Sequence, residues 1–192
     1  MFPLVADLRG RRVVVIGAGR VGADKAAALL ECGARVTMIS DRVLAPLPEG
    51  LDQVLVRPYQ PGDLAGALLV VAATANPTVN DAIVDEANER DVLVNVVDDL
   101  ARSNFHFTAN YRDGDVLVSV STAGASPALA QWVRNRAAGA LPKNLAHVAR
   151  QLRRERAQLH DAGESTERQP WAARVNELVG ESGDAGESPA RS

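Results

Sequence analysis

Three glycines near the amino terminus are spaced for a tight turn that brings the backbone close to a ligand. They lie in Gly17-Ala18-Gly19-Arg20-Val21-Gly22, which fits the pattern G-x-G-x-x-G between an expected strand and an expected helix. In this pattern the first glycine permits the turn, the second admits a pyrophosphate, and the third lets helix and strand pack closely. The helix start adds N–H donors and a positive dipole end. We predict that Gly17, Gly19, Arg20, Val21 and Gly22 bind a dinucleotide; a glycine-rich turn without a ligand is the alternative.

The residue that meets the adenosine ribose is expected roughly 20 residues beyond such a loop, at the end of the second strand. Ser40, Asp41 and Arg42 stand there. Asp41 can accept hydrogen bonds from both ribose hydroxyls and would repel a 2′-phosphate, whereas Arg42 would attract that phosphate. We predict NAD as the cofactor, bound by Ser40 and Asp41. The alternatives are NADP, or an exposed loop aspartate without a ligand.

Thr74 and Asp98 each follow an apolar run typical of a buried strand. Because parallel sheets bind ligands at the carboxyl ends of their strands, both residues are expected at a binding site. A carboxylate such as Asp98 can take a proton while a substrate loses a hydride to nicotinamide. The alternatives are local: Asp98 caps a turn together with Asp99, and Thr74 belongs to the turn in which Asn76 starts a helix.

A loop rich in small and hydroxyl residues, Ser121-Thr122-Ala123-Gly124-Ala125-Ser126, precedes a further expected helix. Hydroxyls and backbone N–H groups at a helix start suit an anionic ligand. Ser126 is equally well placed as a plain N-terminal cap, with Pro127 in the first turn, and this role does not exclude the other.

The elements that must position these residues follow from the apolar pattern. Strands are expected at 12–16, 35–39, 53–56, 68–73 and 92–97, with helices at 21–32 and 78–89. This alternation predicts an α/β fold with a parallel sheet and helices on both of its faces, because parallel pairing needs crossover connections. Beyond it we expect a hairpin of 105–111 with 115–120, a helix from Pro127, and a last helix at about 144–160.

Composition bounds the class of protein. The chain has 192 residues, 46% hydrophobic and 23% charged, with a net charge of −3 and one cysteine, Cys32. These values are ordinary for a soluble domain, exclude an intrachain disulfide and argue against a nucleic-acid partner. The start lacks the features of a signal peptide and no run is long enough to cross a bilayer, so we expect a cytoplasmic protein without a membrane partner.

Charge is distributed unevenly along the chain. The stretch 131–156 holds seven basic side chains against one acidic, Glu155. This stretch is either a solvated helix face or a surface for a polyanionic ligand, and composition does not choose between them. Residues 181–192 are polar and rich in glycine and serine, which predicts a disordered tail.

Four segments together resemble the precorrin-2 dehydrogenase/sirohydrochlorin ferrochelatase family. They are FPLVADLRGRRVVVIGAGRVGADKAAALL, VVAATANPTVN at 70–80, NVVDDLARSNF at 95–105 and VLVSVSTAGASPALAQWVR at 116–134. The resemblance implies an NAD-binding Rossmann domain (1–110), a dimerisation region (111–142) and a short helical domain (143–180), before the tail. It implies NAD-dependent oxidation of precorrin-2 to sirohydrochlorin, with Fe²⁺ insertion as a second activity of many members.

The resemblance also implies roles for individual residues. The family's catalytic aspartate falls on Asp98, and the expected partners are precorrin-2, sirohydrochlorin, Fe²⁺ as a substrate, and a second copy of the chain in a homodimer. The family's substrate carries eight carboxylates, which gives the hydroxyl loop and the downstream arginines an anionic partner. The predicted substrate-binding residues are Asn95, Ser121, Thr122, Gly124 and Ser126.

The sequence departs from the family pattern in three places. Thr122 stands where a second serine is frequent, Thr108-Ala109 replaces a usual Pro-Ala, and the helical tail is short. The short tail leaves the chelatase activity less supported than the dehydrogenase. His106, His147 and His160 lack the spacing of metal ligands, so no metal site is predicted. A non-catalytic NAD-sensing module is the competing interpretation, although it gives Asp98 and the hydroxyl loop no task.

Overall fold

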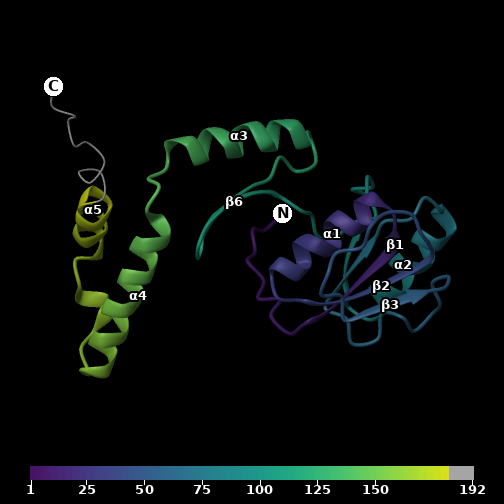
Figure 1. Cartoon of the computed structure of the whole chain (residues 1–192), viewed down its shortest axis with the longest axis horizontal. Helices are drawn as coiled ribbons and strands as arrows, with labels where there is room; N and C mark the ends of the chain where they lie inside the picture. Colours follow the sequence, from purple (N-terminus) through teal and green to yellow (C-terminus); the bar gives the residue numbers. More distant parts are fainter. Residues whose placement is uncertain (182–192) are drawn as a thin grey trace. The chain divides into compact units, whose positions relative to one another are not determined.

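The computed structural model describes residues 1–181 and divides the chain into two compact units, the first ending at His106 and the second starting at Phe107. Figure 1 traces the elements along the chain. The tail predicted to be disordered lies outside the described residues, apart from Glu181 at its start.

The first unit is built on five parallel strands. They are β1 (Arg12–Ala18), β2 (Arg35–Val43), β3 (Gln53–Val56), β4 (Leu69–Ala72) and β5 (Leu93–Val96). Their order in the sheet is β3-β2-β1-β4-β5, which confirms the predicted parallel α/β fold. Successive strands leave β1 first to one side and then to the other, so a topological switch lies between β1 and β4. Sheets of this kind bind ligands beyond the carboxyl ends of the strands at such a point.

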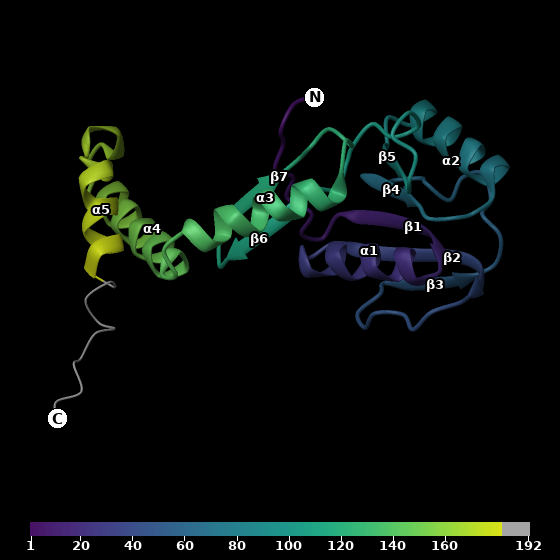
Figure 2. The same ribbon diagram turned by 90° about the horizontal axis from the view of Figure 1, so that it is seen from above.

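Two helices cover the sheet: α1 (Arg20–Glu31) and α2 (Pro77–Glu89). The β1–β2 and β4–β5 crossovers run in opposite directions, and right-handed connections therefore place the two helices on opposite faces (Figure 2). On the α2 face, Ile83 and Ala87 are fully buried against alternate residues of the strands. This core consists of Val14, Ile16, Ile39, Leu64, Val70, Ala72, Ile83, Ala87, Val92, Val94 and Val96. It is aliphatic, as the low aromatic content requires.

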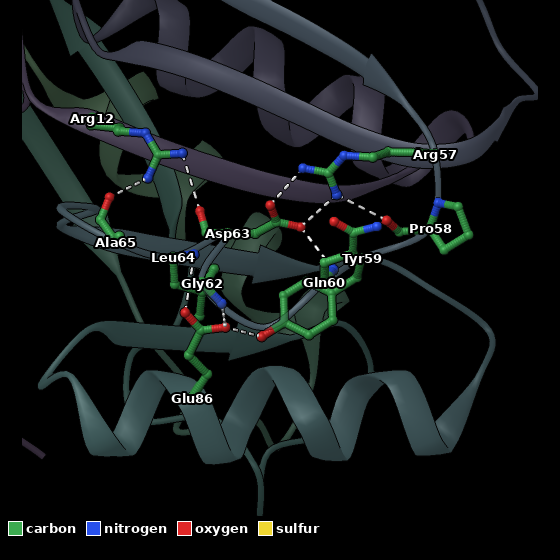
Figure 3. Close-up of polar contacts among 10 residues, drawn as sticks. All are labelled: Arg12, Arg57, Pro58, Tyr59, Gln60, Gly62, Asp63, Leu64, Ala65 and Glu86. Atoms are coloured by element: carbon green, nitrogen blue, oxygen red, sulfur yellow. Dashed lines mark hydrogen bonds and ion pairs between the residues drawn. The ribbon is translucent and has the colours of Figure 1, made fainter.

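The connection from β3 to β4 has no helix and is held by side chains instead (Figure 3). Glu86 of α2 is buried, and its carboxylate accepts hydrogen bonds from the Tyr59 hydroxyl, from Gly62 N at 2.9 Å and from Leu64 N at 3.3 Å. Arg90 Nε also donates to it, at 2.8 Å. We call this group the Glu86 cluster. It pairs the Gly62 and Leu64 N–H groups, which would bind backbone carbonyls if this connection were a helix.

A second acid fixes the same connection. Asp63 accepts from both terminal nitrogens of Arg57, at 2.8 and 2.6 Å, and from Gln60 N at 2.8 Å. Arg12 at the start of β1 donates to the carbonyls of Asp63 and Ala65. The segment 57–66 is therefore anchored to both the sheet and α2.

The second unit begins with a hairpin of β6 (Ala109–Asp113) and β7 (Val116–Val120), joined by Gly114 and Asp115. The turn is where it was predicted, but the first strand starts four residues later than the expected 105. Asn104 is instead bound to β5: its N–H donates to the Val94 carbonyl at 2.9 Å, and its Oδ1 accepts from Val94 N at 2.7 Å. These bonds hold the chain beside β5 and delay the hairpin.

Helix α3 (Pro127–Ala140) packs on the hairpin and is followed by α4 (Leu145–Asp161), a 3₁₀ turn (Thr166–Arg168) and α5 (Trp171–Glu181). The prediction that the helix ending near 160 is the last was wrong. Leu178 of α5 is buried, and its carbonyl accepts from Asn144 Nδ2 at 3.1 Å, so α5 packs beside the start of α4. Within the described residues, every helix is too short or too polar to cross a membrane.

Candidate functional site

The glycine loop lies at the switch point, between β1 and α1. Gly17 has a φ of +108°, and a Cβ on it would lie 2.3 Å from the Ala73 carbonyl oxygen after β4. A Cβ on Gly22 would lie 2.0 Å from the Gly17 carbonyl oxygen. Any side chain at these two positions would collide with backbone. The geometry thus gives Gly17 the turn and Gly22 the close packing that the sequence pattern predicts.

Gly19 differs from its two neighbours in the motif. A Cβ on it would meet nothing within 4 Å, so its missing side chain serves no packing purpose within the unit. Gly19 is the N-cap of α1 and supplies no side-chain hydrogen bond to the helix, while Arg20 and Val21 are exposed. The start of α1 therefore presents open space and N–H groups without a side-chain cap. A pyrophosphate fits this arrangement.

Ser40, Asp41 and Arg42 form an outward bulge in β2. Ile39 pairs with Ile16 and Val43 pairs with Ala18, so three residues of β2 stand opposite Gly17 alone. The expected strand thus continues to Val43 rather than ending at 39. The Ser40 hydroxyl donates to the Arg42 carbonyl at 2.7 Å, and Asp41 lies 3.6 Å from Arg42 Nε. Asp41 is exposed at the same sheet edge as the glycine loop, where the ribose is expected.

Thr74 follows β4 and is fixed by α2. Its hydroxyl is 2.7 Å from Asn80 Oδ1, and Asn80 Nδ2 donates to its carbonyl at 3.2 Å. Asn76 caps α2 by accepting from Thr78 N and Val79 N. The predicted turn chemistry is therefore present for Asn76, while Thr74 lies directly beside the glycine loop: a Cβ on Gly17 would be 3.3 Å from Thr74 N.

Asp98 occupies a tight turn after β5. Its φ is +60°, a left-handed conformation that aspartate tolerates better than most residues, and its side chain is exposed. Asp99 supplies the local hydrogen bond of the turn, since its Oδ1 accepts from Arg102 N at 3.1 Å. Of the two aspartates that could cap this turn, Asp99 therefore makes the capping hydrogen bond.

The charge of Lys25 on α1 interacts with the Asp98 carboxylate. The side chain is half-buried, and burial lowers the pKa of Lys25, while the negative charges of Asp24 and Asp98 oppose that shift. The Asp98 carboxylate therefore lies within electrostatic range of a cation on α1.

Three side chains hold the chain after Asp98 against β5. The Ser103 hydroxyl accepts from Val96 N at 2.9 Å and donates to the Asp99 carbonyl at 2.6 Å. Asn95 is buried, and its Nδ2 donates to the Phe105 carbonyl at 3.1 Å. Together with Asn104, these contacts give the segment 95–105 its shape. No role was predicted for Ser103 or Asn104. They follow the end of β5 by seven and eight residues, so their polar type alone did not show that they bind its backbone. Asn95, predicted to bind substrate, holds backbone here.

The hydroxyl loop of the second unit is internally bonded. Thr122 Oγ1 accepts from Ser126 N at 3.2 Å and donates to the Ser126 carbonyl at 3.0 Å. Ser126 Oγ accepts from Leu129 N at 3.2 Å and so caps α3. Ala123 and Gly124 both have positive φ values. The hydroxyl of Thr122 closes the loop, which a serine would do equally well. Ser121 and Gly124 are exposed.

The first unit therefore brings four groups of predicted residues to one sheet edge. These are the glycine loop, the β2 bulge, Thr74 and Asp98, at the carboxyl ends of β1, β2, β4 and β5. The hydroxyl loop belongs to the second unit. In the part of the chain that the structure describes, no group of three or more His, Cys, Asp or Glu side chains could hold a metal ion.

The sequence of this chain is similar to those of known proteins. Residues 4–109 match the model of a family described as "Putative NAD(P)-binding". Siroheme synthase 2 of Aeromonas salmonicida (strain A449) is 40% identical over 146 residues, which are 75% of this chain and 30% of that protein. Siroheme synthase of Photorhabdus laumondii is 35% identical over 153 residues, 78% of this chain and 33% of that protein. The chain thus spans about a third of the length of these curated relatives.

A solved structure shows the same fold. SirC, a precorrin-2 dehydrogenase, matches with a TM-score of 0.69 over 94% of this chain and 88% of its own, at 24% identity. The predicted NAD-binding Rossmann architecture, followed by a small β-hairpin and helical part, is confirmed by this likeness together with the family match.

Proposed function

Because the chain belongs to the NAD(P)-binding family whose model spans its residues 4–109, we propose that it is a precorrin-2 dehydrogenase that uses NAD⁺. The reaction is the oxidation of precorrin-2 to sirohydrochlorin, with NADH and a proton as the other products. One observation carries the proposal: an exposed carboxylate, Asp98, stands at the same sheet edge as an uncapped helix start with the three glycines of a dinucleotide loop. The substrate is proposed from the name of the similar solved structure, a precorrin-2 dehydrogenase, and the curated relatives, named siroheme synthase, support the same class of substrate.

The residues present fit the dinucleotide. Gly19 leaves room at the start of α1 for a pyrophosphate, and Asp41 is exposed on the β2 bulge for the ribose hydroxyls. Asp41 would repel a 2′-phosphate, which favours NAD over NADP. When bound, the nicotinamide accepts a hydride from the substrate. Thr74, held by Asn80 beside the glycine loop, borders the space for the nicotinamide half.

Asp98 is the base in this proposal. The macrocycle loses two hydrogens, one as a hydride and one as a proton, and the Asp98 carboxylate takes the proton. The turn that presents Asp98 is held by the backbone contacts of Ser103 and Asp99, so its carboxylate is not needed to maintain the turn. Ser121, Thr122, Gly124 and Ser126 would meet carboxylates of the substrate through the exposed side of their loop.

Two finer proposals accompany the dehydrogenase. Fe²⁺ is a substrate for insertion into sirohydrochlorin, with Asp98 receiving pyrrole protons; the name siroheme synthase of the relatives supports it. The chain also forms a homodimer, because α3 exposes large apolar side chains: Leu129 is 48% and Trp132 is 61% exposed. Light scattering at micromolar concentration should then give twice the monomer mass of 20.3 kDa.

A single coupled assay tests the proposed function. Purified protein is mixed anaerobically with NAD⁺ and precorrin-2, and NADH absorbance is followed; Fe²⁺ is then added and metallation of the macrocycle is recorded. Stoichiometric NADH is the expected result. NAD⁺ binding without NADH would overturn the dehydrogenase in favour of a non-catalytic NAD-sensing module. NADH without metallation would restrict the protein to the first reaction.

A further inference from the structure

The outward side of α4 carries exposed basic side chains, none of which is named in the proposed reaction. The helix buries one stripe, made of Leu145, Val148, Leu152, Glu155 and Leu159, which are buried or half-buried. On the opposite side, Arg150 and Arg154 are exposed and lie one helical turn apart, with His147 and Arg153 beside them. We call these four residues the α4 basic face.

The acids near this face are already engaged. Asp115 of the hairpin turn pairs with Arg153 at 2.9 Å, and Asp113 accepts from Ala146 N at the start of α4. Glu155, the single acid within the basic stretch, points to the buried side and is bound by Arg174 of α5 at 2.7 Å. Among the described ion pairs, none involves Arg150 or Arg154. Like charges at this spacing slightly destabilise a helix, and a bound anion would relieve this repulsion.

The side chains of the α4 basic face limit the classes of ligand that it can bind. Arginine guanidinium groups match carboxylates and phosphates with two parallel hydrogen bonds. The apolar stripe of α4 is packed in the second unit, so it is not available for insertion into a lipid surface. The chain carries a net charge of −3, and the face has no exposed aromatic side chain for stacking bases. A small polyanion with several carboxylates remains as the best match.

We propose that the α4 basic face captures the carboxylate-bearing rim of the tetrapyrrole substrate before it reaches the site of oxidation. This inference rests on the proposed function for the identity of the substrate. The face acts by electrostatic attraction, which raises the local concentration of an anionic ligand and weakens as salt screens it. It therefore contributes to substrate capture and leaves the chemical step at the sheet edge unchanged.

The first test compares two double variants with the same change of charge. Arg150→Gln/Arg154→Gln alters the face, and Arg112→Gln/Arg168→Gln removes two exposed arginines elsewhere in the same unit. KM for precorrin-2 and kcat are measured at about 20 mM and about 200 mM salt. We expect the face variant to raise KM about tenfold at low salt with kcat unchanged, and the difference to shrink at high salt. Equal KM values in the face and control variants would overturn the proposal.

The second test does not depend on turnover. Binding of an octacarboxylate porphyrin to the full chain is followed by fluorescence. Tripolyphosphate and duplex DNA are tested as alternative ligands. The porphyrin should bind wild type and lose affinity in Arg150→Gln/Arg154→Gln. Arg150→Lys/Arg154→Lys keeps the charge but not the paired hydrogen bonds and should retain part of the affinity. Stronger binding of tripolyphosphate or DNA than of the porphyrin would overturn the proposal, as would a lysine pair that is as weak as the glutamine pair. Porphyrin capture without precorrin-2 oxidation would instead reject the proposed function alone.

Discussion

Two carboxylates of the first unit, Glu86 and Asp98, have opposite surroundings. Glu86 is buried, and both of its oxygens accept hydrogen bonds from Tyr59, Arg90 and two backbone N–H groups. Asp98 is exposed in a left-handed turn whose shape depends on neighbouring side chains. A buried acid whose acceptors are all used can only hold structure. An exposed acid that other groups hold in place can exchange a proton with a ligand.

Replacing Asp98 by asparagine should produce the largest effect on catalysis and almost none on stability. Asparagine also tolerates the left-handed conformation, so the turn is retained, but it cannot act as a base at neutral pH. Precorrin-2 oxidation should fall by about 10²–10⁴-fold, or about 3–5 kcal/mol of barrier. NADH formation, NAD⁺ affinity and the free energy of unfolding are measured on both proteins. A variant that retains more than about a tenth of the rate would exclude base catalysis by Asp98 as a major contribution.

Gly19→Val separates cofactor binding from packing. Because a Cβ at this position meets nothing within 4 Å, the variant should fold, while its side chain occupies the space proposed for the pyrophosphate. Calorimetry should show NAD⁺ affinity reduced by more than about 100-fold, or roughly 3 kcal/mol. Gly139→Val, at an open position on α3, is the matched control and should bind NAD⁺ normally. Unchanged affinity in Gly19→Val would mean that the loop is wrongly assigned.

Glu86→Gln should reduce stability and leave catalysis unchanged, which is the opposite of the result expected for Asp98→Asn. The amide keeps one acceptor oxygen and places an NH₂ group against two of the former donors, so two hydrogen bonds are lost in a buried site. We expect the free energy of unfolding to fall by about 2–3 kcal/mol, measured by urea titration, with kcat for precorrin-2 unchanged. Glu89→Gln, exposed on the same helix, should change stability by less than about 0.5 kcal/mol. If both variants behaved alike, the Glu86 cluster would not stabilise the segment 57–66.

Lowering the pH should also reduce the stability that Glu86 contributes, with a smaller effect than the substitutions. Burial alone would raise the pKa of Glu86, but the hydrogen bonds from Tyr59, Gly62, Leu64 and Arg90 outweigh it and lower the pKa below its usual value. The lowered pKa means that the unfolded chain binds a proton first, so this stabilisation is complete above about pH 4.5 and is lost as pH falls through the folded-state pKa. Wild type should therefore lose more stability between pH 5 and 3 than Glu86→Gln does, as measured by chemical unfolding. Parallel curves would contradict this linkage.

The sequence predicted the sheet of the first unit well because its signals are local and strong. The apolar run at β4 is continuous, the run at 13–16 in β1 is also continuous, and the run at β5 is interrupted only by Asn95. A right-handed crossover leaves few possible orders for parallel strands. The same holds for the glycine loop, whose first and third glycines meet backbone at the predicted places.

Features that depend on long-range contacts were not predictable in this way. Glu86 is one polar residue on a helix, and only the folded chain brings Gly62 and Leu64 N–H groups to it. Ser103 and Asn104 bind the backbone of β5, which displaced the start of the hairpin. Helix α5 was missed although Trp171, Arg174 and Leu178 recur at helical spacing, because the surrounding composition is polar.

The place of β1 at the centre of the sheet has a consequence for the synthesis of this chain on the ribosome. This strand pairs with β2 on one edge and with β4 on the other, yet β4 ends 54 residues further along the chain, at Ala72 rather than Ala18. At a synthesis rate of about 5–20 residues per second, roughly 3–10 s separate the two on the ribosome. During that interval one edge of a strand whose residues 13–16 are all apolar has no native partner. The nascent chain is therefore most exposed to wrong strand pairing before the glycine loop can close against Ala73.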